Sequence, residues 1–367
     1  MISMNDFVAE PSQLRDEMLQ AVKRVVDSGW YILGPELKAF EAQWASTCGF
    51  AEAIGVANGM DAIEIALRSL DIGPGDEVIT TPMTAFASVL AVLRAGAVPV
   101  LADIDPATGL MSLDSAERCV SPRTKAVLLV HLYGQLRQPQ RWIEFCQRHA
   151  VSLVEDCAQA HLANLDGAYA GSFGRAGAYS FYPTKNLGAL GDAGMLVTGD
   201  QQLAERARQL RNYGQSVRYL HPEIGMNSRL DEIQAAMLSV RLKWLEGFTD
   251  RRRVIAKAYR EGIQNSAVRL LSEPQTADAH VYHLFVVLCE QRDELASYLE
   301  SSGVQALIHY PVPIHHQASC PDILRDPQGL AHSEAHAKTC LSLPCHPQMS
   351  DDDVATVISA INGFRAA

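Results

Sequence analysis

The chain has 367 residues, of which 48% are hydrophobic and 20% charged, and its formal net charge is -11 at pH 7. This length exceeds what one hydrophobic core usually organises, so we expect two domains. The negative net charge argues against nucleic acid or an anionic membrane as a partner. Any phosphate that the protein binds must therefore be held by a local site. No apolar run reaches membrane-spanning length and no signal-peptide pattern is present, so we expect a cytoplasmic protein.

The eight cysteines are scattered without CxxC spacing. This pattern predicts neither a disulfide framework nor a zinc site. Cys345 and His346 are the nearest approach to a metal pair, but adjacent residues seldom converge on one ion without further ligands. We therefore expect no bound metal.

Two amphipathic helices are predicted near the N-terminus. The first runs from Pro11 to about Ser28 and ends before Gly29, and the second begins at Pro35, a favourable first-turn residue. Apolar side chains recur along both at helical spacing. Such a stripe is far more often a core face than a ligand site.

From Ala53 onward, short apolar runs alternate with helical segments. The pattern is typical of a largely parallel sheet covered on both faces by helices. Strands are expected at 53–56, 78–80, 98–101, 126–130, 152–154 and 195–198, and helices near 60–70, 84–95, 112–119 and 139–149. Ligands bind at the carboxyl ends of the strands in such sheets, so the residues that follow each strand are site candidates.

Asn58 and Gly59 follow the first of these strands and open a helix. Free N–H groups at a helix N-terminus, together with the helix dipole, favour a phosphate. The alternative is that Asn58 only caps the helix. No GxGxxG pattern follows, so a dinucleotide site has little support.

Asp156 comes just after the strand at 152–154, and Lys185 lies further along among apolar, aromatic and small residues. The carboxylate either caps a helix or pairs with a cationic ring nitrogen of a cofactor. Loss of hydration lowers the pKa of such a lysine, as a Schiff-base lysine requires, although a surface lysine in a glycine-rich loop is the alternative. A hairpin near 163–172 and one returning strand would let both side chains face one pocket.

The remaining chain is expected to complete the large domain and form a smaller α+β domain. We place the boundary near Glu246, giving domains 1–246 and 247–367. In the second domain a strand is predicted at 281–288 and helices at 293–302 and 353–364. Two prolines make the segment 309–316 extended, either as a rigid loop that carries polar side chains to a cleft or as a surface turn with incidental histidines.

Several motifs, taken in their order along the chain, are similar to those of a known protein family. They include "SGWYILGPELKAFE", "GVANGMDAI", "VHLYGQ", "VEDCAQAH", "SFYPTKNLGALGDAG", "LRNYG", "NSRLDEIQAA" and "HYPVPIHHQ". Together they resemble the DegT/DnrJ/EryC1/StrS family of pyridoxal-phosphate-dependent sugar aminotransferases, from about Gly29 to Pro347. The resemblance implies an α/β fold of the aspartate-aminotransferase type, with a large mixed, mostly parallel sheet domain and a small α+β C-terminal domain. It also implies a homodimer with shared active sites.

The resemblance assigns three residues to the reacting part of the cofactor. Lys185 resembles the lysine that holds pyridoxal 5'-phosphate and moves the proton. Asp156 resembles the partner of the ring nitrogen, and Gln159 the residue that contacts the ring hydroxyl.

Other residues are matched to the rest of the cofactor site. Gly59, Met60 and Ser180 fall where the family holds the phosphate, and Asn227 matches an asparagine donated by the neighbouring subunit. Met60 replaces the usual Thr or Ser, so one hydroxyl donor is missing. Ala85 stands where an aromatic residue usually stacks on the ring. Phe86, the next residue, is either its substitute or plain core.

The resemblance implies that L-glutamate converts the cofactor to pyridoxamine 5'-phosphate, which then aminates a keto sugar linked to a nucleotide. The motifs "VHLYGQ" and "HYPVPIH" resemble members that aminate carbon 3 more than those that act at carbon 4. Six side chains are candidates for hydrogen bonds to the sugar hydroxyls: His131, Tyr133, Gln135, His309, Tyr310 and His315. Arg211 and Arg218 are candidates for binding the pyrophosphate or the glutamate carboxylate. The alternative for His131 and Tyr133 is that they only satisfy buried backbone groups.

Two other functions compete with transamination. A pyridoxamine-dependent sugar dehydratase of the same fold replaces the lysine with histidine or adds an iron–sulfur cluster, whereas this chain keeps Lys185 and lacks a suitable cysteine cluster. The other competing function is that of a sensor that binds cofactor or sugar without turnover, and no partner-docking module is evident. Formation of 2-oxoglutarate from glutamate distinguishes transamination from both.

Overall fold

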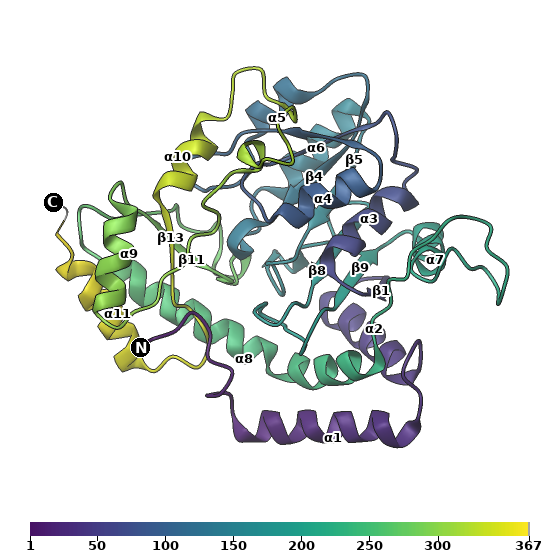
Figure 1. Ribbon diagram of the computed structural model, residues 1–367, viewed down its shortest axis with the longest axis horizontal. Helices are drawn as coiled ribbons and strands as arrows, with labels where there is room; N and C mark the ends of the chain where they lie inside the picture. The colour runs from purple at the N-terminus through teal and green to yellow at the C-terminus, as the bar shows by residue number, and fades with distance from the viewer. Residues whose placement is uncertain (366–367) are drawn as a thin grey trace.

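The computed structural model describes residues 1–365, and an eight-stranded sheet forms its centre (Figure 1). The strand order is β1-β9-β8-β5-β4-β2-β3-β12. All pairs from β8 to β12 are parallel, whereas β1 and β9 pair antiparallel, as do β9 and β8. The prediction of a mixed, mostly parallel sheet is therefore confirmed. The strands are β1 Glu52–Val56, β2 Glu77–Thr80, β3 Val98–Leu101, β4 Thr124–Val130, β5 Ser152–Asp156, β8 Ala176–Ser180, β9 Gly194–Thr198 and β12 Leu324–Arg325.

Helices cover both faces of this sheet because successive strand residues point in opposite directions. Val78, Leu128 and Val154 belong to a core cluster shared with α3, α4 and α7. Their sequence neighbours Ile79 and Leu153 pack with α5 and α6 on the other face. The helices are α1 Ser12–Ser28, α2 Pro35–Cys48, α3 Gly59–Ser69, α4 Phe86–Arg94, α5 Leu113–Cys119, α6 Pro139–His149 and α7 Gln201–Leu210.

The C-terminal part is built on a second, three-stranded antiparallel sheet in the order β10-β11-β13. Its core takes Ile255, Ala256 and Tyr259 from the long helix α8, so α8 packs against both parts of the molecule (Figure 1). The predicted boundary near Glu246 falls inside this helix, and the division into domains stays a prediction. The elements are α8 Glu232–Gly262, β10 Arg269–Leu270, β11 Phe285–Leu288, α9 Arg292–Ser301, α10 Ala331–Thr339, β13 Cys340–Leu343 and α11 Asp351–Gly363.

One short strand of the C-terminal part returns to the large sheet. In β12, Leu324 pairs with Val100 and Arg325 with Leu101, parallel to β3. The next residue, Asp326, accepts a hydrogen bond from the Arg118 Nε of α5 at 2.9 Å. The outer edge of the large sheet is thus completed by residues far along the chain.

The predicted strand at 281–288 is too long. Only Phe285–Leu288 forms β11, because Tyr282 adopts φ 45°, outside the strand region. The hairpin expected near 163–172 is present as β6 Asn164–Leu165 and β7 Ala168–Tyr169. Among residues 1–365, no helix combines the length and apolarity needed to cross a bilayer.

Candidate active site

The candidate site lies where β4, β5 and β8 end side by side. Val130 at the end of β4 is in register with Asp156, and Asp156 is in register with Ala178 of β8. Because side chains alternate along a strand, Asp156 points to the face covered by α3 and α4, and Glu155 points to the other face. The carboxyl edge of the sheet therefore presents the Asp156 carboxylate, as the sequence predicts.

The Asp156 carboxylate is held from two sides. Its Oδ2 accepts a hydrogen bond from Ser88 Oγ at 2.7 Å, and its Oδ1 accepts one from the Ala158 N–H at 3.1 Å. Ser88 Oγ lies in turn 2.8 Å from Thr84 Oγ1. The side chain is 6% exposed, so the carboxylate is fixed in direction and largely shielded from water.

Lys185 lies in the turn that follows β8. Its backbone N–H donates to the Tyr182 carbonyl at 2.8 Å, which closes the turn. The surrounding protein desolvates the half-buried amine and lowers its pKa from 10.5 to about 8, against the opposing attraction of Asp156. A substantial share of the amine is therefore neutral near pH 8, the form that attacks a carbonyl.

The N-terminus of α3 faces the end of β8. Asn58 caps the helix, since its Oδ1 accepts from the Asp61 N–H at 2.8 Å. The N–H groups of Gly59 and Met60, the first two helical residues, have no acceptor within the helix. A Cβ atom on Gly59 would lie 2.7 Å from Ser180 Cβ, so glycine permits β8 to approach. This arrangement offers N–H groups and a serine hydroxyl to an anion.

Gln159 connects two other segments at the same edge. Its Oε1 accepts from the Tyr133 N–H at 2.6 Å, and its Nε2 donates to the Tyr310 hydroxyl at 3.2 Å. Burial, with the nearby Asp156 charge, raises the pKa of Tyr310 to about 12. The phenol therefore stays protonated and keeps Gln159 in one orientation.

These groups fit pyridoxal 5'-phosphate. The cofactor has a phosphate, a ring nitrogen that can carry a proton and an aldehyde carbon. The chain offers an anion site at the N-terminus of α3, a buried carboxylate at Asp156 and an amine with a lowered pKa at Lys185. The donor set is complementary to each part of the cofactor.

The structure pairs His131 with a neighbouring carboxylate, and its contact with the sugar stays a prediction. Its Nε2 lies 2.8 Å from Glu155 Oε2, and its side chain is 3% exposed. Glu155 also accepts from the backbone N–H groups of Gly171, Phe173 and Gly174. Since Glu155 and Asp156 point to opposite faces, His131 braces a loop on the far side of the sheet.

Tyr133 and Gln135 are also engaged within the protein, and their contacts with the sugar stay predictions. The Tyr133 hydroxyl donates to the His309 carbonyl at 2.7 Å and lies 2.9 Å from His336 Nε2. Gln135 is 1% exposed and its Oε1 lies 3.4 Å from an Arg137 guanidinium nitrogen. The open alternative for Tyr133, that it satisfies a buried backbone group, agrees with its hydrogen bond to the His309 carbonyl.

Arg211 and His315 are also engaged within the protein. The Arg211 guanidinium pairs with Glu41 at 2.6 Å and donates to the Gly55 carbonyl at 2.7 Å. The His315 Nε2 lies 3.1 Å from Glu334 Oε1, with the side chain 1% exposed. Their polar atoms hold neighbouring elements together, and their contacts with the substrate stay predictions.

The other predicted residues lie in different surroundings. His309 is half-buried, with its Nδ1 2.9 Å from Ser342 Oγ, and burial together with the Lys185 charge lowers its pKa to about 4. Phe86 packs at the start of α4 against the apolar cluster around Val89 and Ile314, as the core alternative expects. Arg218 stands over the Tyr219 ring at 5.0 Å on an exposed loop, and Asn227 is exposed at its base.

Ser88 and Thr84 are the site residues that the sequence did not single out. Thr84 precedes the N-cap of α4, and Ser88 lies in the first turn of this helix. Their hydroxyl oxygens are 2.8 Å apart. Only the fold brings them to Asp156, which is far away in the sequence.

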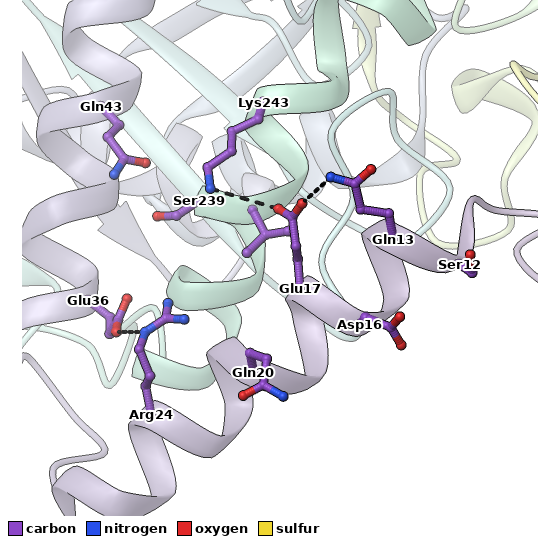
Figure 2. Close-up of a pocket in the computed structure, with 11 residues that line it drawn as sticks. Ser12, Gln13, Asp16, Glu17, Gln20, Arg24, Glu36, Gln43, Ser239 and Lys243 are labelled. Carbon is purple, nitrogen blue, oxygen red and sulfur yellow. Dashed lines mark hydrogen bonds and ion pairs between the residues drawn. The ribbon is translucent and has the colours of Figure 1, made fainter.

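A cavity of about 740 Å³ lies elsewhere, between α1, α2 and α8 (Figure 2). Four of its five charged side chains are paired, Arg24 with Glu36 and Lys243 with Glu17. It contains none of the groups described above, so we do not assign the chemistry to it.

Comparison with known proteins identifies the setting of this site. Residues 12–362 match the DegT/DnrJ/EryC1/StrS aminotransferase family. The dTDP-3-amino-3,4,6-trideoxy-alpha-D-glucose transaminase of Streptomyces venezuelae is 44% identical over 97% of this chain and 94% of its own length. The dTDP-3-amino-3,6-dideoxy-alpha-D-galactopyranose transaminase of Aneurinibacillus thermoaerophilus is 43% identical over 99% of each.

Solved structures agree with the fold. DesV of S. venezuelae, in complex with a ketimine intermediate, superposes with a TM-score of 0.94 at 43% identity, over 98% of this chain and 97% of the other. NtdA of Bacillus subtilis with bound cofactor PMP gives a TM-score of 0.89 at 29% identity, over 96% and 82%. The predicted aspartate-aminotransferase type of fold is confirmed.

Proposed function

The chain belongs to the DegT/DnrJ/EryC1/StrS aminotransferase family, and from that premise we propose that it moves an amino group from L-glutamate to carbon 3 of a nucleotide-linked keto sugar. The aminotransferase activity and the pyridoxal 5'-phosphate cofactor follow from the family and from the PMP-bound neighbour. Carbon 3 is supported by two relatives named as transaminases of 3-amino sugars. Cytoplasmic location stays a prediction.

Lys185 is proposed to hold the cofactor and to carry the proton in both halves of the reaction. Its lowered pKa of about 8 is the observation that supports this most strongly, because a proton carrier works best with a pKa near the operating pH. The amine can then both accept a proton from a carbon atom and return it. The aromatic and small residues around it limit the access of water.

Asp156 is proposed to keep the ring nitrogen protonated. Pyridoxal phosphate supplies, when bound, an electron-withdrawing ring that stabilises negative charge beside the transferred nitrogen. Asp156 accepts a hydrogen bond from Ser88 at 2.7 Å, which directs the carboxylate. Gln159, fixed by Tyr133 and Tyr310, is proposed to contact the ring hydroxyl.

The phosphate is assigned to the N–H groups of Gly59 and Met60 and to the Ser180 hydroxyl. These donors lie where α3 meets β8, and a Cβ on Gly59 would be only 2.7 Å from Ser180. His309 and Tyr310 remain candidates for the sugar. Tyr310 contacts Gln159 and therefore lies beside the proposed position of the cofactor ring.

A homodimer is proposed to complete the site. Exposed apolar side chains are concentrated on the loop 213–225, where Tyr219 is 80% and Ile224 87% exposed, and this loop projects beyond α7 (Figure 1). Trp30 and Tyr31 are 59% and 50% exposed. Surfaces of this kind are typical of protein contacts. Asn227 and Arg218 would then serve the partner's site.

The proposal is tested with purified protein, L-glutamate and matched pairs of 3-keto and 4-keto sugars on the same nucleotide. We expect 2-oxoglutarate and an amino sugar from the 3-keto substrate, and no product with Lys185→Ala. Faster turnover of the 4-keto isomer would overturn the carbon-3 assignment. Cofactor or sugar binding without 2-oxoglutarate would instead indicate a sensor, and loss of a sugar hydroxyl without amine transfer a dehydratase.

A further inference from the structure

Two histidines and one carboxylate meet on the outside of the large sheet. His315 and His316 end the short 3-10 helix η3 Ile314–His316, and Glu334 lies in the first turn of α10. One ligand atom from each lies within 4.8 Å of the other two. The sequence predicts a sugar contact for His315, but it assigns no role to His316, to Glu334 or to the three side chains together.

The distances suit one small cation. His315 Nε2 is 3.1 Å and His316 Nε2 is 3.7 Å from the same Glu334 oxygen. Ligand bonds of about 2.0–2.2 Å to a tetrahedral zinc ion place neighbouring ligand atoms about 3.3–3.5 Å apart. The two measured separations lie on either side of that range, so small side-chain rotations would close the site.

Both supporting segments are held firmly. The Ile314 N–H donates to the Pro82 carbonyl at 3.1 Å, and the Ile314 side chain is 2% exposed. At the other side, Asp103 accepts from the N–H groups of His332 and Ser333 at 3.0 and 2.8 Å. The three ligand side chains therefore project from fixed backbone, which reduces the entropy lost on binding.

Access from solvent is also present. The side chain of His315 is 1% exposed, whereas those of His316 and Glu334 are 52% and 39% exposed. A cation could enter from the side of His316 and Glu334 and keep its fourth position for water. Imidazole and carboxylate together favour zinc over calcium or magnesium, which prefer oxygen ligands alone.

We propose that His315, His316 and Glu334 form a binding site for a divalent transition metal of the zinc type, which joins η3 to α10. The site is separate from Lys185 and Asp156, and it does not depend on the proposed function. Its place in the fold suggests a stabilising role, because η3 follows the segment that carries His309 and Tyr310. The cysteine spacing gave no sign of it, since no cysteine takes part.

One feature limits the expected affinity. The His315 Nδ1 is buried and has no hydrogen-bond partner among the described residues. Most metal-bound histidines donate their second N–H to an acceptor, and losing that partner typically weakens metal binding about 10- to 100-fold. We therefore expect binding weaker than that of a structural zinc site with a complete second set of hydrogen bonds.

The test is zinc binding by untagged, cofactor-loaded protein after treatment with a chelator. Competition with a chromogenic chelator should give one Zn²⁺ per chain in the wild type. His316→Ala and Glu334→Gln should each weaken binding at least about tenfold, because each removes one of three ligands. His332→Ala is the matched control, an exposed histidine on the same helix that lies outside the cluster, and it should bind as the wild type does.

A second measurement guards against misfolded variants. Zn²⁺ should raise the Tm of the wild type and of His332→Ala, and should leave that of His316→Ala unchanged. His316 is half exposed and its removal leaves the His315–Glu334 contact in place, so this variant should fold. Equal zinc binding by His316→Ala and the wild type, or no binding by the wild type, would overturn the proposal.

Discussion

At the residue scale, Lys185 combines two opposing influences. Desolvation lowers the pKa of its amine to about 8, and the Asp156 carboxylate acts in the opposite direction by stabilising the ammonium form. The sequence predicted the first influence from the apolar, aromatic and small residues around Lys185. The second depends on β5 and β8 lying side by side, so it follows from the fold.

This balance gives a test on cofactor-free protein. The rate at which an amine-reactive reagent labels Lys185 should rise with pH around a midpoint near 8, since only the neutral amine reacts. In Asp156→Asn the midpoint should move to lower pH, because the charge that favours the ammonium form is gone. Peptide mass mapping gives the labelling rate, with the exposed Lys257 as internal control. An unchanged midpoint in Asp156→Asn would show that the carboxylate does not act on the amine.

Ser88 is the second residue whose role can be tested. Ser88→Ala removes the 2.7 Å hydrogen bond to Asp156, and hydrogen bonds to charged groups contribute about 1.5–3 kcal/mol. We expect kcat to fall about tenfold or more, with an unchanged circular dichroism spectrum.

Thr84→Val is the matched control for Ser88→Ala. Thr84 contacts Asp156 only through Ser88, so its loss should be smaller. If the two variants are equally active, or if Ser88→Ala keeps the wild-type rate, the direction of the carboxylate is set by other contacts.

At the element scale, the junction of α3 with β8 depends on a missing side chain. A Cβ on Gly59 would lie 2.7 Å from Ser180 Cβ, so Gly59→Ala must push the helix from the strand. Because the two donors on α3 and the Ser180 hydroxyl would separate, we expect cofactor affinity to fall at least about tenfold. Equilibrium dialysis against pyridoxal 5'-phosphate gives the Kd.

Gly247→Ala is the matched control for this change. Gly247 lies in α8, and an added Cβ there would meet no atom within 4 Å. Alanine is the better helix former, so this variant should be as stable as the wild type or slightly more stable, with unchanged cofactor affinity. Equal affinity in both variants would show that the phosphate is not held at the start of α3.

The elements also show where prediction from sequence stops. The strands expected at 98–101 and 152–154 are present, and the second extends to Asp156; they could be predicted because their runs are largely apolar. Helix α10 and strand β13 were not predicted, since α10 carries little apolar periodicity and is held mainly through Asp103 and its neighbours. Asp156 was singled out because it comes just after a predicted strand, and Lys185 because its neighbours are apolar, aromatic and small; their roles stay predictions. The surroundings of His131 could not be predicted, because its contact with Glu155 depends on how β4 and β5 pair.

At the scale of the whole molecule, the homodimer can be tested by complementation. If Asn227 serves the partner's site, a hybrid dimer of Lys185→Ala and Asn227→Ala subunits contains one site free of both changes. Mixing the two impaired proteins should then restore part of the activity. Each hybrid dimer has one intact site of two, so its activity should reach about half that of a wild-type dimer. Mass spectrometry of isotope-labelled subunits confirms exchange. Absence of recovery despite exchange would argue for a site completed within one chain.

The return of β12 to the large sheet has a consequence for how the protein is made. During synthesis, β3 emerges more than two hundred residues before Leu324 and Arg325, its partners. Until then the N–H and C=O groups along the outer side of β3 are unpaired, and a free strand edge readily pairs with another chain. A nascent or truncated chain that ends near residue 246 is thus exposed to aggregation. The C-terminal segment therefore covers this edge of the large sheet only after most of the chain has been synthesised.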